Sequence, residues 1–177
     1  TVEAGDYSSD LNYKKIDSLK VNGATIKDDA ENDATLTLSS PADAGSLGAN
    51  KDIVIDANNP DTASVTTPAD GETYNATSMS TEFSGQVGDD VNGAGMDANS
   101  ATFYIKDNNT NNYWNGTTWI TITWLATTHS ATTDGSEVAW TYIITLPSWT
   151  DGHSYEVKAK ALDKAGNTLL TTKSLFF

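Results

Sequence analysis

The segment Asp151–Asn167 constrains the fold of this chain more than any other. It reads D-G-H-S-Y-E-V-K-A-K-A-L-D-K-A-G-N, with turn-forming pairs at both ends. Its apolar residues alternate with charged ones, and they are Tyr155, Val157, Ala159 and Ala161. A period of two places one face of a strand in a core and the other in water. The segment therefore predicts a half-buried strand between two turns, as in the second half of a β-sandwich.

A weaker copy of the pattern that ends this strand occurs far upstream, at Ile26–Leu38. This segment reads I-K-D-D-A-E-N-D-A-T-L-T-L, against A-L-D-K-A-G-N-T-L-L-T-T-K at Ala161–Lys173. Glu31 stands where the later segment has Gly166, which argues against a tight positive-φ turn at the upstream site. Two domain endings are therefore present, and only the second follows a full set of strand signals.

Strand signals with turn residues between them continue along the chain, and no amphipathic helix is expected. The expected strands are 18–21, 24–27, 35–38, 63–66, 79–87, 100–107, 112–114, 117–125, 137–146, 154–162 and 168–176. Asn22-Gly23 and Asn115-Gly116 each predict a two-residue hairpin. The Pro-containing linker Ile55–Thr62 divides a partial β-domain, 1–55, from a complete antiparallel β-sandwich, 56–177. The fold class is all-β.

Three strands carry specific expectations about the core. In 137–146 one face holds Val138, Trp140, Tyr142, Ile144 and Leu146, which makes Trp140 a strong core candidate. In 118–125, Ile120, Ile122 and Trp124 share one face and Trp119 lies on the other. Tyr155 follows a turn at the start of its strand, where sandwiches often place a tyrosine corner.

The charge balance limits the possible partners. The chain has 24 carboxylates against 10 basic residues, all of them Lys, and a formal net charge of -14. Nucleic acid is not expected, because its phosphates need basic patches and Arg is their usual bidentate partner. Crowded carboxylates instead favour divalent cations. The chain has no Cys, and no stretch approaches the roughly 20 apolar residues of a membrane span.

Several strings taken together carry a family resemblance. They are D-G-x-x-Y-x-V-x-A-x-A-x-D-x-A-G-N, I-D-A-N-N-P-D-T, P-A-D-G-E-T-Y-N, S-G-Q-V-G-D-D-V-N-G-A-G-M-D and Y-W-N-G-T-T-W. They look like the bacterial immunoglobulin-like repeats that occur in tandem in surface adhesins and other secreted proteins of prokaryotes. Residues 53–177 resemble a full repeat, and residues 10–55 resemble the carboxyl-terminal half of a preceding one. The resemblance implies an immunoglobulin-like sandwich on the cell surface.

A half repeat cannot bury its own faces or pair its own edges. Three solutions are open: the chain is a fragment, the segment packs on the complete domain, or strands from another protomer complete it. The third would generate a filament by strand addition between identical subunits. The expected partners are therefore neighbouring immunoglobulin-like repeats or identical protomers.

Two loops predict a calcium site. Asp89 and Asp90 lie in the acidic loop V-G-D-D-V-N-G-A-G-M-D, and Asp163 lies in the turn that ends the 154–162 strand. These loops lie at the same end of a sandwich, and some tilts of the domain would bring Asp56 of the linker there. Ca²⁺ takes about six to eight oxygen ligands, and related repeats sometimes bind it near inter-domain junctions. Alternatively, these carboxylates only cap turns.

Aromatic and histidine side chains are further candidates for binding sites. Trp114 and Trp119 flank the 115–116 hairpin, where they form either a stacking platform for sugar rings or a cross-strand pair that stabilises the sheet. His129 and His153 lie in polar loops with no third zinc ligand spaced beside them. We expect no enzyme, but a non-catalytic extracellular structural or adhesive module, either a stalk repeat or a filament subunit. The alternative is a carbohydrate-binding or accessory module of a secreted enzyme.

Overall fold

The computed structural model describes residues 1–75, 77–143 and 145–176, and it divides into two units. One unit is Ser8–Ile55, and the other combines Thr1–Tyr7 with Asp56–Phe177. The division at 55/56 is where the sequence places a boundary. Thr1–Tyr7 nevertheless belong with the later unit, because Gly5 donates a backbone hydrogen bond to Ala57 (3.3 Å) and Ala57 donates one to Asp6 (3.0 Å).

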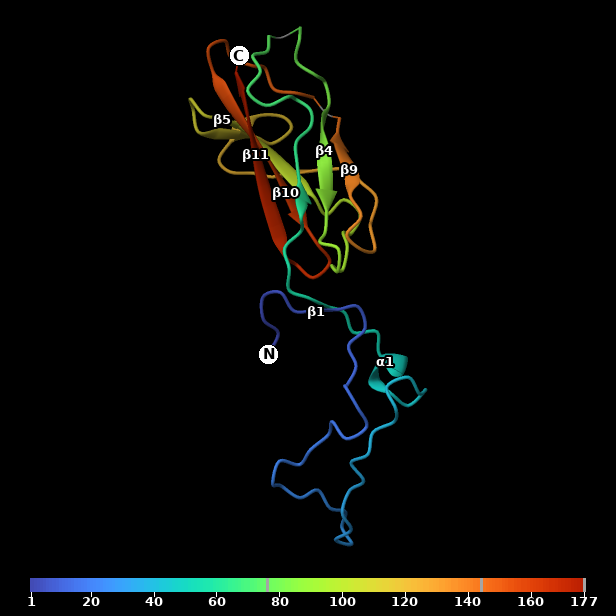
Figure 1. Ribbon diagram of the computed structural model, residues 1–177. Helices are drawn as coiled ribbons and strands as arrows, with labels where there is room; N and C mark the ends of the chain where they lie inside the picture. The colour runs from blue at the N-terminus through green and yellow to red at the C-terminus, as the bar shows by residue number, and fades with distance from the viewer. Residues whose placement is uncertain (76, 144, 177) are drawn as a thin grey trace. The chain divides into compact units, whose positions relative to one another are not determined.

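Nearly all of the regular secondary structure is β-strand, so the all-β prediction is confirmed (Figure 1). The elements in order are β1 Tyr7–Ser8, α1 Leu47–Asn50, β2 Ile55–Asp56, β3 Thr62–Ala63, β4 Phe83–Gly88, β5 Thr102–Asp107, β6 Asn112–Trp114, β7 Trp119–Ile120, β8 Leu125–Ala126, β9 Val138–Tyr142, β10 Ser154–Leu162 and β11 Thr168–Phe176. Strands β6, β10 and β11 have the predicted bounds. The helix α1 is a single turn.

Two antiparallel sheets form the sandwich in the later unit. One has the order β3-β4-β9, and the other has the order β11-β10-β5-β6-β7 with β8 also paired to β5. Figure 1 shows β4 beside β9 and β10 beside β11. In β4, β9 and β10 the residues that alternate along the strand are the buried ones, so burial and register agree in these strands.

Strand β10 buries the face that its alternation predicts. Tyr155, Val157 and Ala161 have no exposed surface and Ala159 is 1% exposed, whereas the residues between them are half-buried. Its two neighbours are β11 and β5, with Val157 opposite Lys173 and Ile105. The Tyr155 hydroxyl accepts a 2.9 Å hydrogen bond from the Thr150 amide, which is the upstream backbone contact of a tyrosine corner.

Aromatic rings fill the space between the sheets. Phe103 of β5 lies 5.6 Å from Phe83, 5.3 Å from Trp140 and 4.7 Å from Tyr142, measured between ring centroids. Trp140 is fully buried, as predicted, and its indole nitrogen donates to the Ser64 carbonyl oxygen at 3.0 Å. Of the other residues expected on its face, Val138 and Leu146 pack against the core, and Ile144 lies outside the described residues.

The prediction of one strand over 117–125 is wrong in its middle. Only Trp119–Ile120 (β7) and Leu125–Ala126 (β8) form ladders, and Trp119 packs on the core while Ile122 is 67% exposed. The hairpin before β7 has a four-residue loop instead of two residues, because Trp114 pairs with Trp119. The Asn115 side chain fills this loop by accepting from the amides of Thr117 and Thr118.

The unit Ser8–Ile55 departs furthest from expectation. The strands predicted at 18–21, 24–27 and 35–38 do not form, and Lys27–Asp33 is an isolated bridge. The Asn22-Gly23 turn is present, with φ of 48° and 87°. Its flanks do not pair as a hairpin ladder, because Ile26 accepts from Ala34 and Ile16 accepts from Leu38. No apolar face in this unit is covered, so no ladder is held in place.

Contrary to expectation, Glu31 lies in a tight turn with positive φ. Glu31 has φ 65° and the corresponding Gly166 has φ 97°. Asp28 accepts at one carboxylate oxygen from the amides of Ala30 and Asn32, both at 2.9 Å. These side-chain bonds hold the turn although Glu31 carries a Cβ.

Candidate metal centre

Three carboxylates converge at one end of the sandwich unit. Asp56 ends β2, Asp89 follows β4 and Asp163 follows β10. One oxygen of each lies within 4.8 Å of the other two, and Asp89 and Asp163 are 3% and 4% exposed. Residues from three distant parts of the chain thus meet, and two of them come from the loops after the 79–87 and 154–162 strands that the sequence analysis places at one end of the sandwich.

Backbone amides hold each carboxylate in place. Asp56 accepts from the amides of Asn58 (3.1 Å) and Ala94 (2.8 Å), and Asp89 accepts from those of Asp90 (3.0 Å) and Gly95 (2.7 Å). Each of these bonds goes to a different carboxylate oxygen. An ionised carboxylate has about four acceptor sites, so each retains capacity for a further ligand.

Asp163 is held by its own turn. Its two carboxylate oxygens accept from the backbone amide of Asn167 at 2.8 Å and from the side-chain amide of Asn167 at 2.9 Å. The same Asn167 side chain donates to the Asp56 carbonyl oxygen at 3.3 Å, which ties the turn to the start of the unit. Lys164 donates its amide to the Gly95 carbonyl oxygen at 2.9 Å. The three loops are therefore connected by hydrogen bonds as well as by proximity.

The negative charges act on one another. Burial raises the pKa of Asp89 above its ordinary value, and the nearby charges of Asp56 and Asp163 raise it further, against the opposing effect of the Gly95 and Asp90 amides. A divalent cation would offset this repulsion, because it supplies a positive charge beside the buried carboxylates. An all-oxygen donor set of this kind suits calcium.

Asp90 takes a different position from the other predicted ligands. Its Oδ2 accepts from the Asn58 side chain at 3.3 Å and from the Asn92 amide at 3.4 Å. Its Oδ1 is buried and finds no hydrogen-bond partner in the described part of the chain, yet Asp90 is not part of the three-carboxylate cluster. Asp56, the weakest candidate from the sequence, takes its place.

Sequence reasoning missed the partners that orient the cluster. They are the amides of Ala94 and Gly95 and the side chain of Asn167. Gly95 has φ 82°, and a Cβ there would lie 2.5 Å from the Thr132 carbonyl oxygen, so only glycine fits. The Gly-rich composition of the 88–97 loop was the available signal for such a close approach.

An acidic depression adjoins the cluster. It has a volume of about 370 Å³ and is lined by Asp61, Thr62, Asp89, Val91, Asp134, Gly135, Ser136 and Glu137. Four of these eight residues are acidic. Asp89 therefore belongs both to the cluster and to the lining of the depression.

Of the two tryptophans considered for sugar binding, Trp114 lies in the core cluster and Trp119 packs against it. Trp114 is 6% exposed and its ring lies 5.7 Å from that of Trp119, which stacks on Tyr155 at 5.8 Å. These contacts favour the cross-strand interpretation of the pair. Both histidines are also engaged: His129 accepts from the Ala101 amide at 3.0 Å, and His153 lies 3.0 Å from an oxygen of Asp107.

Comparison with family models, with curated proteins and with solved structures gives no match for this chain. In the described ranges no helix is long and apolar enough to cross a membrane.

Proposed function

We propose that this chain is a non-catalytic structural or adhesive module of a cell surface, built from immunoglobulin-like repeats and used as a stalk repeat or filament subunit. Two features of the sandwich support the immunoglobulin-like assignment. The sheet orders β3-β4-β9 and β11-β10-β5-β6 correspond to strands A-B-E and G-F-C-C′ of that fold. Tyr155 at the start of β10, the counterpart of strand F, makes the corner contact.

The observation that carries the proposal is the uncovered apolar surface of Ser8–Ile55. Among these residues only Ser46 is buried. Leu11, Ile16, Leu19, Ile26 and Val54 are 39% to 54% exposed. A segment of this size gains too little burial to be stable alone, so a partner surface is required.

A groove in this unit supports the proposal of a strand partner. It has a volume of about 270 Å³ and is lined by Val21, Ala24, Thr25, Ile26, Asp33, Ala34 and Leu36. Backbone groups along its rim make few ladder bonds. An added strand would pair with these groups and place alternate side chains in the groove. We propose that a neighbouring repeat or an identical protomer supplies that strand.

Calcium at Asp56, Asp89 and Asp163 would serve the same mechanical role. Asp56 is the first residue of the sandwich unit after the break at Ile55. A cation bridging it to the loops after β4 and β10 would fasten the incoming chain to two long strands. Pulling force would then be carried by the sheets rather than by the 57–61 linker.

Assembly of the full chain tests the proposal. Negative-stain microscopy and light scattering should show polymers or oligomers whose size rises with concentration. Ile26→Glu should abolish them, because a charge in the groove cannot be buried without a partner. Ile122→Glu is the matched control, since Ile122 is 67% exposed in the sandwich unit. A monodisperse monomer would exclude the filament and leave the stalk repeat.

A further inference from the structure

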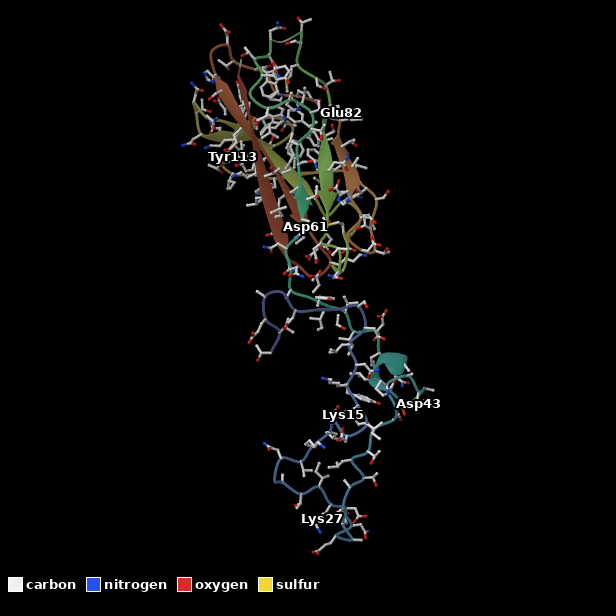
Figure 2. All side chains as sticks on the ribbon, viewed as in Figure 1. Lys15, Lys27, Asp43, Asp61, Glu82 and Tyr113 are labelled. Carbon is white, nitrogen blue, oxygen red and sulfur yellow. The ribbon has the colours of Figure 1, made fainter. Side chains whose placement is uncertain are left out.

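A second feature lies on the outer face of the larger sheet, on the side away from Val157 and Ala159. We call it the lysine–aromatic face, and it consists of Tyr104, Lys106, Tyr113, Trp124, Lys158 and Lys160. Register places Lys158 opposite Tyr104, and Lys106 opposite both Glu156 and Tyr113. Figure 2 labels Tyr113, which comes from β6. The face therefore spans three neighbouring strands and the segment before β8.

The aromatic rings form one continuous group. Tyr104 is at its centre, with its ring 5.0 Å from that of Tyr113 and 4.9 Å from that of Trp124, both edge to face. The Tyr104 hydroxyl donates to a carboxylate oxygen of Glu156. Burial and this carboxylate raise the pKa of Tyr104 well above its ordinary range, so the hydroxyl remains a proton donor. The group is thus fixed in place before any ligand arrives.

Cationic side chains lie over these rings. The Lys160 ammonium is 4.8 Å from the Trp124 ring centroid, and the Lys158 ammonium is 5.9 Å from that of Tyr104. Such contacts orient the lysine stems along the sheet while the charged ends reach solvent. Two lysines two residues apart on one strand place their Cα atoms about 6.6 Å apart.

The lysines of this face have no carboxylate partner among the described residues, although the chain carries 24 acidic residues. Three of the five lysines of Ser8–Ile55 differ, because Lys15 and Lys20 both pair with Asp17, and Lys27 pairs with Asp33. Glu156 also lies on this face, opposite Lys106. Three lysines against one carboxylate leave the face with an excess of positive charge in a strongly acidic protein, which is complementary to an anionic ligand.

We propose that the lysine–aromatic face binds an acidic glycan, a sugar chain that carries carboxylates at intervals. The half-buried rings of Trp124 and Tyr113 contact the apolar faces of sugar rings, and the ammonium groups of Lys106, Lys158 and Lys160 bind the carboxylates. A nucleic acid fits poorly, because its dense phosphates would be repelled by the net charge of -14 and no Arg is present. The site shares no residue with the groove at 21–36, so the test of glycan binding is independent of the test of assembly.

Calorimetry with the full chain tests the site. The probes are a hyaluronan decasaccharide as acidic ligand, chitohexaose as neutral ligand and a single-stranded DNA decamer as phosphate polymer. We expect binding to hyaluronan only, weakened as salt is raised. Lys158→Gln with Lys160→Gln should weaken hyaluronan binding at least about tenfold. Lys158→Arg with Lys160→Arg keeps both charges and should retain the binding. The control pair Lys14→Gln with Lys51→Gln makes the same charge change on exposed residues of Ser8–Ile55 and should leave the affinity within about twofold.

Four results would overturn the site. They are absence of hyaluronan binding, equal loss in the control pair, equal binding of DNA, and equal binding of chitohexaose. Light scattering identifies the competing occupant, because self-association lost only in the Lys158 and Lys160 variant would assign the face to a second copy of this chain. Melting temperatures of all variants exclude loss of folding as the cause, and Trp124→Ala should weaken hyaluronan binding without removing a charge.

Discussion

The turns Asp28–Asn32 and Asp163–Asn167 share a hydrogen-bond pattern and differ in their surroundings. In both, the Asn backbone amide donates to one Asp oxygen (2.9 and 2.8 Å) and the Asn side chain donates to the other (both 2.9 Å). In both, the residue before Asn has positive φ. The five-residue sequence alone therefore suffices to specify the turn.

Only the second turn is part of a site. Asp28 is exposed, and its bonds to Asn32 lower its pKa, whereas Asp163 is 4% exposed and belongs to the carboxylate cluster. The difference comes from the unit around each turn. The sandwich buries its apolar side chains behind Asp163, and Ser8–Ile55 buries none behind Asp28.

The largest expected effect contrasts the two units directly. Phe103→Ala removes a fully buried ring in contact with Phe83, Trp140 and Tyr142, and it should lower the free energy of unfolding by about 3 to 5 kcal/mol. Leu36→Ala in the dilute monomer should change it by at most about 0.5 kcal/mol. Urea unfolding followed by tryptophan fluorescence measures the first, because all five Trp lie in the sandwich unit.

Circular dichroism and hydrogen exchange of residues 8–55 measure the second variant. A cost of several kcal/mol for Leu36→Ala at low concentration would mean that Ser8–Ile55 has a core of its own, and the contrast between the units would fail. A loss of stability that appears only at concentrations where the chain assembles would instead support the contrast between the units, because the partner then buries Leu36.

Calcium should distinguish the two turns by a smaller amount. Extracellular modules bind calcium with a Kd of about 10⁻⁴ to 10⁻³ M, so 10 mM calcium should stabilise the sandwich by about 1 to 3 kcal/mol. Asp163→Ala should lose this increment, and Asp28→Ala, which breaks the same turn bonds, should keep it. Thermal melting with and without calcium gives the answer, and an unchanged wild-type midpoint at millimolar calcium would dismiss the site.

The calcium increment should also depend on pH. The folded-state pKa of Asp89 is raised from 3.8, so ionising this buried group destabilises the fold. Without calcium, Asp89 makes stability decrease as the pH rises from about 4 through its folded pKa. Calcium binds the ionised form, so its increment should grow over the same range. Melting curves at several pH values test this. A calcium stabilisation that does not depend on pH between 4 and 7 would show that Asp89 does not take part in calcium binding.

The sandwich was largely predictable because its strands carry their own patterns. β10 alternates strictly and β9 places Trp140 inward, so register and burial follow from the sequence. The failures occur where a distant partner decides. The strands expected at 18–38 need a covering surface, and the meeting of Asp56 with Asp89 and Asp163 depends on how the linker enters the fold. Asp89 and Asp90 are adjacent residues of the same type, and only the path of the chain separates their roles.

The smallest expected effect comes from exchanging the residue with positive φ in the two turns. Glu31 and Gly166 both have positive φ, at 65° and 97°, and a side chain in that region costs about 1 to 2 kcal/mol. Glu31→Gly should therefore stabilise the Asp28 turn, although greater freedom in the unfolded chain offsets part of the gain. Hydrogen exchange at the Asn32 amide measures it, because this amide is bonded to Asp28. Gly166→Glu should destabilise the sandwich by about 1 kcal/mol, since open space surrounds that position and only backbone strain opposes the substitution. Exchange at Asn32 that is unchanged by Glu31→Gly would show that the Asp28 bonds, rather than the backbone preference, determine the stability of the turn.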